Sequence, residues 1–126
     1  MVIEDEELLL EAITKKLKLE GFEVVSCTQA TQALEYLKTL QELPDVIWLD
    51  YYLPDMNGLE FMDKLRQVSD WSKIPVVVIS NSASPQKVEA MLKWGASKYL
   101  LKAEHRLGDL VNIIKEFTKG GDNHDG

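Results

Sequence analysis

The chain has 126 residues and a formal net charge of −7, from 14 Lys+Arg and 21 Asp+Glu. This length predicts a single domain, and the negative charge argues against direct binding of nucleic acid, because contact with phosphates requires a basic surface. A single cysteine excludes an intrachain disulfide, and no apolar run approaches the roughly 18 residues that a membrane span requires. We therefore expect a soluble cytoplasmic protein that binds neither nucleic acid nor membranes.

Five short apolar runs alternate with longer segments of helical periodicity. Each run is rich in Val, Ile or aromatic residues, as is typical of strands buried on both faces of a parallel sheet. The predicted strands are Val2–Ile3, Phe22–Ser26, Val46–Leu49, Val76–Ile79 and Tyr99–Leu101.

The segments between these runs carry apolar residues three or four positions apart, together with residues that start or stop helices. The signals are Gly21 after the first helix, Thr28 as N-cap of the second, Asn57 with Glu60 as a capping box of the third, Ser84-Pro85 at the start of the fourth, and Gly95 after it. A fifth helix is predicted by the spacing of Leu107, Leu110, Ile114 and Phe117.

Strand and helix therefore alternate five times. This order predicts right-handed crossovers and a doubly wound α/β fold around a five-stranded parallel sheet. We expect one domain over residues 1–118, and the glycine-rich, polar residues 119–126 predict a disordered tail.

Polar and charged residues follow four of the five predicted strands. Glu4 and Asp5 follow the first, Asp50 the third, Ser80 the fourth and Lys102 the fifth. The carboxyl ends of parallel strands meet at one edge of a sheet, where ligands bind.

Three carboxylates there repel one another, by about 4 kcal/mol for two unit charges 4 Å apart at an effective dielectric of 20. A hard cation relieves this repulsion, and two histidines with one cysteine are too few for a typical zinc site, so Mg²⁺ is the expected metal.

This set of residues suits phosphoryl transfer. Asp50 would attack phosphorus, Mg²⁺ and Lys102 would neutralise the phosphoryl oxygens, and Ser80 would donate a hydrogen bond to one of them. Taken singly, a strand-end Asp is more often a helix cap, a Ser a turn residue and a Lys a solvent-exposed charge. Their convergence at four strand ends favours the functional interpretation.

Four stretches of the sequence resemble the receiver domain of two-component response regulators. They are Glu4-Asp5-Glu6, residues 45–58 (DVIWLDYYLPDMNG), residues 75–80 (PVVVIS) and residues 95–102 (GASKYLLK). The spacing also matches the family, with 30 residues from Asp50 to Ser80 and 22 from Ser80 to Lys102. The resemblance extends over residues 1 to about 118 and implies a flavodoxin-like, three-layer (βα)5 sandwich.

The resemblance implies a role for each matching residue. Asp50 would accept a phosphoryl group from a sensor histidine kinase or a histidine phosphotransfer protein. Ser80 would be the switch hydroxyl, Lys102 the cation that pairs with the phosphoryl group, and Tyr99 the switch aromatic. The implied Mg²⁺ ligands are Asp5, Glu4 through water, Asp50, and Tyr52 through its backbone carbonyl.

Such a domain catalyses its own phosphotransfer and a slow hydrolysis of the aspartyl phosphate, but it is mainly a signalling switch. Its output would be an altered affinity for a partner protein, whose identity the sequence leaves open, through the predicted fourth and fifth helices. We expect a monomer or a weak, phosphorylation-dependent dimer.

Three positions carry expectations of their own. Ala103 follows Lys102 where the family usually has a proline, often in a cis peptide. Because a cis bond before another residue costs about 2.5–4 kcal/mol, we expect a trans or strained bond and a changed loop there. Lys98 replaces an acid of many transcription-factor receivers, which disfavours their shared dimer. The ring of Tyr52 is placed to shade the phosphoryl group from water, which predicts slow self-dephosphorylation.

Three other functions share features with this sequence. A receiver-like interaction module that takes no phosphate is the main alternative, favoured by Ala103 and the short first strand. An aspartyl-phosphate hydrolase of the haloacid dehalogenase kind needs a second Asp where this chain has Tyr52. A flavodoxin needs a phosphate-binding loop after the first strand, where Glu4 and Asp5 would repel the flavin phosphate.

Overall fold

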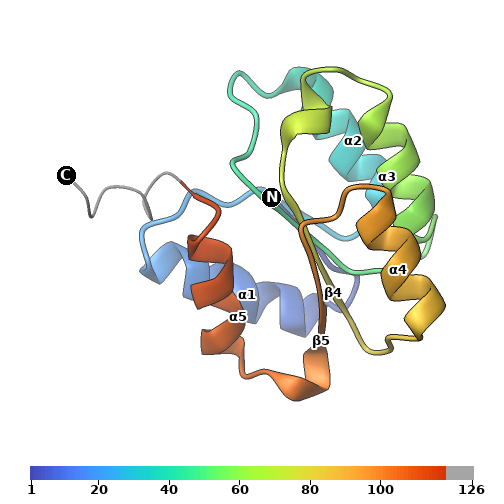
Figure 1. Cartoon of the computed structure of the whole chain (residues 1–126). Coiled ribbons are helices and arrows are strands. Elements are labelled where there is room, and N and C mark those ends of the chain that lie inside the picture. Colours follow the sequence, from blue (N-terminus) through green and yellow to red (C-terminus); the bar gives the residue numbers. More distant parts are fainter. Residues whose placement is uncertain (119–126) are drawn as a thin grey trace.

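The structure is a computed structural model, and it describes residues 1–118 (Figure 1). Five parallel strands form one sheet in the order β2-β1-β3-β4-β5. The strands are β1 Val2–Ile3, β2 Ser26–Cys27, β3 Ile47–Leu49, β4 Val76–Ser80 and β5 Lys98–Leu101. The helices are α1 Glu7–Leu19, α2 Ala30–Thr39, α3 Gly58–Arg66, α4 Pro85–Lys93 and α5 Leu107–Lys115, with 3-10 turns η1 Trp71–Lys73 and η2 Lys102–Glu104. The expected fold class is confirmed, whereas the expected tail at residues 119–126 lies outside the described residues.

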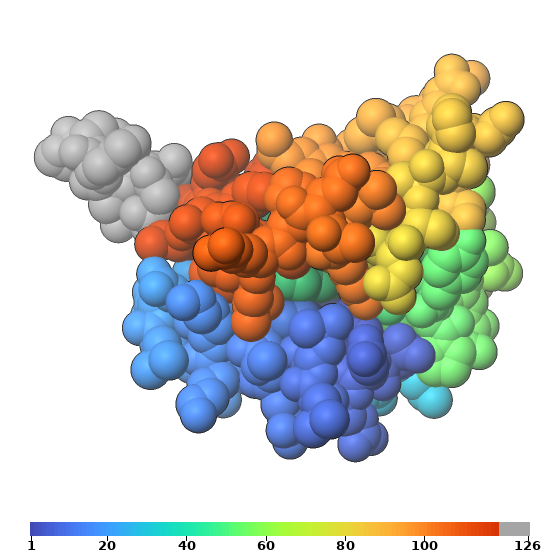
Figure 2. Space-filling view, turned by 90° about the horizontal axis from the view of Figure 1, so that it is seen from below, coloured from blue at the N-terminus to red at the C-terminus, as the bar shows by residue number. Residues whose placement is uncertain are grey.

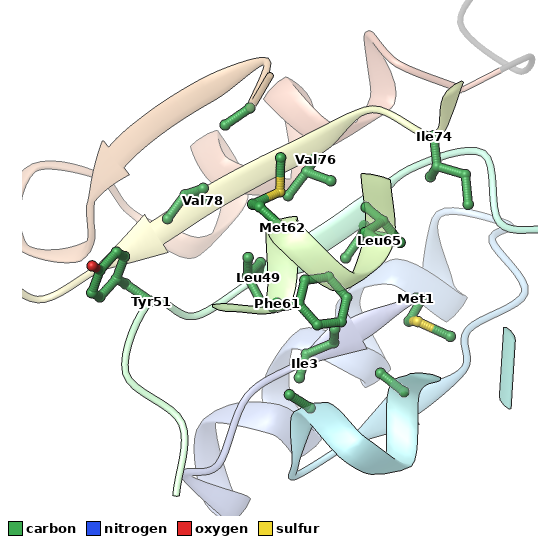
Figure 3. Close-up of a cluster of buried hydrophobic side chains, with 14 of the residues drawn as sticks. Met1, Ile3, Leu49, Tyr51, Phe61, Met62, Leu65, Ile74, Val76 and Val78 are labelled. Atoms are coloured by element: carbon green, nitrogen blue, oxygen red, sulfur yellow. The ribbon is translucent and has the colours of Figure 1, made fainter. Parts of the chain in front are cut away.

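Helices cover both faces of the sheet and enclose two apolar clusters. Helices α2, α3 and α4 lie on one face, and α1 and α5 lie side by side on the other (Figure 1). Alternate strand residues point to opposite faces. In Figure 3 the labelled Ile3, Leu49, Val76 and Val78 pack against Phe61 and other residues of α3. Trp48 points to the other face, where it is buried among residues of α1 and α5.

The second strand is shorter than the prediction of Phe22–Ser26. Strand β2 covers only Ser26–Cys27, because its neighbour β1 offers a partner only over Val2–Ile3. Apolar residues before it pack against a core cluster without joining the sheet, apart from one hydrogen bond from Val2 N–H to the Val25 carbonyl over 2.8 Å. The other four predicted strands agree with the structure to within one residue at each end.

Most helix signals are confirmed, and the one at Thr28 is wrong. Asn57 and Glu60 form a reciprocal capping box, and the Ser84 hydroxyl accepts a hydrogen bond from Lys87 N–H. Helix α2 begins after Gln29 with no cap from its own N-terminal residues. The cap is Asp55, whose carboxylate accepts hydrogen bonds from the N–H groups of Ala30 and Thr31 over 3.0 and 2.7 Å. Asp55 caps the helix where Thr28 was predicted to do so, because Asp55 brings two acceptor oxygens and a negative charge to the helix N-terminus.

The C-terminal end of α4 is fixed by Arg66, the last residue of α3. Its guanidinium donates to the carbonyls of Trp94 over 3.2 Å and of Gly95 over 2.8 Å, and to the carbonyl of Ser72. Gly95 has a φ of +104°, a conformation that favours glycine, so it ends α4 as predicted.

All peptide bonds of the described residues, including Lys102–Ala103, are trans. Within residues 1–118, no helix combines the length and apolar character needed to cross a membrane.

Candidate functional site

Charged residues that follow three strands meet at the carboxyl edge of the sheet. Strands β1, β3, β4 and β5 are neighbours, so the segments that follow them converge. Backbone hydrogen bonds fix the residues that follow β1 and β3. Glu4 N–H donates to the Cys27 carbonyl over 2.9 Å, and Asp50 N–H donates to the Ile3 carbonyl over 3.0 Å. Figure 2 shows this edge face-on, where the blue N-terminal segment meets the green, yellow and orange segments that follow β3, β4 and β5.

The three carboxylates that the sequence singled out form one cluster. Glu4, Asp5 and Asp50 each place a carboxylate oxygen within 4.8 Å of the others. Glu4 is fully buried and Asp50 is 4% exposed, whereas Asp5 faces solvent. Burial raises the pKa of Asp50 to about 7, the nearby charge of Glu4 adds to the rise, and Lys102 opposes it. Without a cation, the carboxylate of Asp50 is therefore hard to ionise.

Lys102 lies against two of these carboxylates. Its Nζ is 2.9 Å from Oε1 of Glu4 and 3.5 Å from Oδ2 of Asp50. Burial alone would lower the pKa of Lys102, but the carboxylates of Glu4 and Asp50 outweigh burial and raise it. The ammonium therefore stays protonated. Its single positive charge cannot balance the charges of three ionised carboxylates.

This donor set fits a hard divalent cation. All three side-chain ligands are carboxylates, two come from buried positions fixed by the sheet, and the exposed Asp5 leaves a side open to solvent. Mg²⁺ and Mn²⁺ prefer oxygen ligands, and Mg²⁺ keeps several waters, which such an open side accommodates. The excess negative charge of the cluster supplies the driving force for binding.

Ser80 and Tyr99 lie on the neighbouring strands and share a partner. Ser80 is fully buried at the end of β4, and its hydroxyl accepts a hydrogen bond from Ser82 N–H over 3.3 Å. The Tyr99 hydroxyl donates to the Ser82 carbonyl over 2.7 Å. The two predicted switch residues are therefore linked through the segment that leads from β4 into α4. No sequence pattern marks Ser82, because its contribution comes from its backbone.

The two tyrosines after Asp50 have different environments. Tyr51 is 5% exposed and its ring packs closely against Gly58, where an added Cβ would lie 2.8 Å from the ring. Tyr52 is 48% exposed, and its N–H donates to Oδ1 of Asp50 over 3.3 Å. The ammonium of Lys87, in the first turn of α4, contacts the Tyr52 hydroxyl. Nothing in the local sequence around Lys87 separates it from an ordinary surface lysine.

The fold and this edge define a doubly wound α/β domain with an acidic, lysine-containing site at the carboxyl ends of its strands. Comparison with known proteins identifies the family, because the model of the response regulator receiver domain matches residues 1–115. The chain belongs to this family, the receivers of two-component systems.

Individual relatives agree with the family match. The transcriptional regulatory protein KdpE of Staphylococcus aureus (strain NCTC 8325 / PS 47) is 35% identical over 121 residues, which cover 94% of this chain and 50% of that protein. The solved structure of the Mn²⁺-bound form of response regulator Rcp1 has a TM-score of 0.78 and 25% identity, covering 92% of this chain and 90% of that one. The phosphorylated cyanobacterial phytochrome response regulator RcpA has a TM-score of 0.78 and 27% identity, covering 92% and 89%. The chain spans less than two thirds of the length of the curated relatives, 61% for the rice regulator ORR6.

Proposed function

We propose that Asp50 accepts a phosphoryl group from a phosphohistidine of a sensor histidine kinase or a histidine phosphotransfer protein, in a reaction that depends on Mg²⁺. The observation that carries the proposal is the position of Asp50, which lies within 4.8 Å of two other carboxylates and 3.5 Å from the Lys102 ammonium. The phosphorylated relative RcpA and the Mn²⁺-bound relative Rcp1 support it.

In the proposed reaction a carboxylate oxygen of Asp50 forms a bond to phosphorus while the bond from phosphorus to the imidazole nitrogen breaks. The electron pair of that bond stays on the nitrogen. A Mg²⁺ held by Asp5, Asp50, the Tyr52 carbonyl and, through water, Glu4 would supply positive charge for the phosphoryl oxygens. Lys102 can exchange its contact with Asp50 for one with a phosphoryl oxygen, because its ammonium already lies between the acids.

The switch follows from the two residues linked through Ser82. A phosphoryl oxygen would draw the Ser80 hydroxyl as a hydrogen-bond donor, and Ser82 N–H would then lose its acceptor. The Tyr99 hydroxyl, which bonds to the carbonyl of Ser82, would be released and its ring could turn inward. The segment leading into α4 moves in this scheme, which would alter the affinity of α4 and α5 for an output partner.

The test is a mass measurement after incubation with phosphoramidate and Mg²⁺. We expect a gain of about 80 Da, the mass of one phosphoryl group. EDTA and the Asp50→Asn substitution should each abolish it, whereas Asp45→Asn, at an exposed position before the same strand, should leave it intact. If the wild type gains no mass, the chain is a phosphorylation-independent interaction module; if it gains mass equally in Asp50→Asn, Asp50 is not the acceptor. Either result overturns the proposal.

A further inference from the structure

The outer edge of strand β2 is open. This strand lies at one end of the sheet and pairs with β1 alone. The Val25 carbonyl accepts a hydrogen bond from Val2 N–H over 2.8 Å, and the Cys27 carbonyl accepts one from the residue after β1 over 2.9 Å. Backbone groups of successive residues in an extended chain point in opposite directions, so those of Val24 and Ser26 point away from β1. Such free N–H and carbonyl groups can pair with another extended chain.

A groove of about 500 Å³ is lined by helix α1 together with Ser26 of this edge. The Ser26 hydroxyl lies 2.8 Å from that of Thr14, which joins the helix to the strand. Leu10 and Leu19 also line the groove. Leu10 is buried, whereas Leu19, at the C-terminal end of α1, is 78% exposed. Open backbone groups beside an apolar groove are what the addition of a strand requires, because the backbone supplies affinity and pockets for alternate side chains supply specificity.

The groove is positively charged, although the whole chain carries a net charge of −7. Lys15 and Lys18 line it and are exposed, and Glu11 is the acid of the lining. Neither lysine takes part in an ion pair within residues 1–118. Lys16 turns toward α5, since its Cε lies 3.9 Å from the position that a Cβ of Gly108 would occupy. Two exposed lysines without partners favour a ligand of negative charge.

We propose that this groove binds an extended, acidic segment of a partner protein, which pairs with β2 as a sixth strand. Backbone groups of the segment would bond to Val24 and Ser26, and one apolar side chain would pack against Leu19. Side chains two positions apart lie on the same face of an extended segment. Acidic residues two positions on either side of the apolar one would therefore meet Lys15 and Lys18.

The groove is distinct from the candidate phosphorylation site. Helix α1 begins at Glu7, shortly after the acidic cluster, and its 13 residues extend for about 20 Å. Lys15, Lys18 and Leu19 lie in its last two turns, at the end remote from that cluster. Binding should therefore occur in the unphosphorylated protein and should not require Asp50. The inference can fail while the proposed function holds, and the reverse is also true.

The test is a nuclear magnetic resonance titration of the full chain with the peptide acetyl-Thr-Glu-Thr-Leu-Thr-Glu-Thr-amide, whose leucine and glutamates share one face. We expect the amide signals of Val24, Ser26 and Leu19 to shift with a dissociation constant on the order of 1 mM. At about 5 mM peptide, hydrogen exchange of the Val24 and Ser26 amides should slow about fivefold. Asp50→Asn should give the same result. If these amides neither shift nor slow, the proposal is overturned. It is also overturned if they shift with protein concentration alone, because the edge then pairs with a second copy of the chain.

Substitutions in α1 test the groove with matched controls. Leu19→Ser should weaken binding of the peptide about tenfold. Leu8→Ser, at an 81% exposed position of the same helix outside the groove, should leave binding unchanged. Lys15→Gln combined with Lys18→Gln should weaken it about fivefold, whereas Lys16→Gln should not. Equal effects of the groove variants and their controls overturn the proposal.

Modified peptides test the backbone and the charge separately. N-methylation of the leucine and both glutamates, or instead of the threonines, removes alternate N–H donors, and only one of these two sets can face β2. We expect one N-methylated peptide to lose binding and the other to keep it. A peptide with lysines in place of the glutamates should bind at least about fivefold more weakly. If both N-methylated peptides, or the lysine peptide, bind as tightly as the parent, the proposal is overturned.

Discussion

The Lys102 ammonium lies 2.9 Å from Oε1 of Glu4, a carboxylate that no solvent reaches. This pair joins the end of β1 to the end of β5 across the two strands between them, β3 and β4. In the absence of a cation, Lys102 is the group that neutralises the buried charge of Glu4. The same lysine is the one proposed to pair with the phosphoryl group, so its structural and chemical roles compete for one ammonium.

Replacement of Lys102 should therefore destabilise the metal-free protein. In EDTA, Lys102→Gln leaves Glu4 buried without its cation, and we expect a loss of about 2–4 kcal/mol in the free energy of unfolding. Urea denaturation measures it, and Lys98→Gln, an exposed lysine at the start of the strand that precedes Lys102, should change stability by less than about 0.5 kcal/mol. Adding Glu4→Gln to Lys102→Gln should recover part of the loss. If the double variant is no more stable than Lys102→Gln, Glu4 is not the source of the cost.

The metal-free protein should also lose stability as the pH rises. The pKa of Asp50 is raised to about 7 by burial and by Glu4, so the folded state binds a proton more tightly than the unfolded state does. The stabilisation that follows is complete below about pH 4, the ordinary value of Asp, and is lost as the pH rises through about 7.

The comparison with Asp50→Asn isolates this effect. In EDTA, the stability of the wild type relative to Asp50→Asn should fall by about 1–3 kcal/mol between pH 5 and pH 8.5. Mg²⁺ at pH 8.5 should restore the wild type and leave Asp50→Asn less affected, because the cation replaces the proton. A difference between the two proteins that does not vary with pH would contradict the raised pKa.

Much of this site was predictable because parallel topology is restrictive. Once the strands were placed, the carboxyl ends of β1, β3 and β5 had to meet, and Glu4, Asp50 and Lys102 followed them directly. Local signals such as the capping box of Asn57 with Glu60 were predictable for a different reason, since both partners lie within one helical turn.

Contacts between distant loops were not predictable. Asp55 caps α2 from 24 residues away, and Lys87 reaches Tyr52 over 35 residues, so no local pattern marks either pair. Tyr51 and Tyr52 are adjacent in a loop without periodicity, and only the fold decides which of them is buried. Strand β2 is shorter than predicted because a strand in a sheet extends only as far as its neighbour offers hydrogen-bond partners.

The cap of α2 by Asp55 can be tested through stability. Asp55→Ala removes both acceptors from the N–H groups of Ala30 and Thr31, and we expect a loss of about 1 kcal/mol, typical of a helix cap. Asp63→Ala, at an exposed position within α3, is the control and should have a smaller effect. Burial would raise the pKa of Asp55, but hydrogen bonds from Thr31 and Ala30 hold it below its ordinary value. The contribution of the cap is therefore present at neutral pH and lost as the pH falls through that lowered pKa, so an Asp55→Ala cost that is equal at pH 7 and pH 2.5 would contradict it.

Gly58 tests the packing of Tyr51 beside the site. A Cβ at this position would lie 2.8 Å from the Tyr51 ring and 3.0 Å from the methyl of Met91, whereas alanine in a first helical turn is otherwise favourable by about 0.5–1 kcal/mol. We expect the overpacking to dominate, because the ring is buried, and Gly58→Ala to lower stability by about 1–2 kcal/mol. In a Tyr51→Leu background the ring is gone, so the same substitution should cost less or become stabilising. Thermal denaturation of the four proteins gives the answer, and an equal cost in both backgrounds would show that the contact with Tyr51 does not set the requirement for glycine.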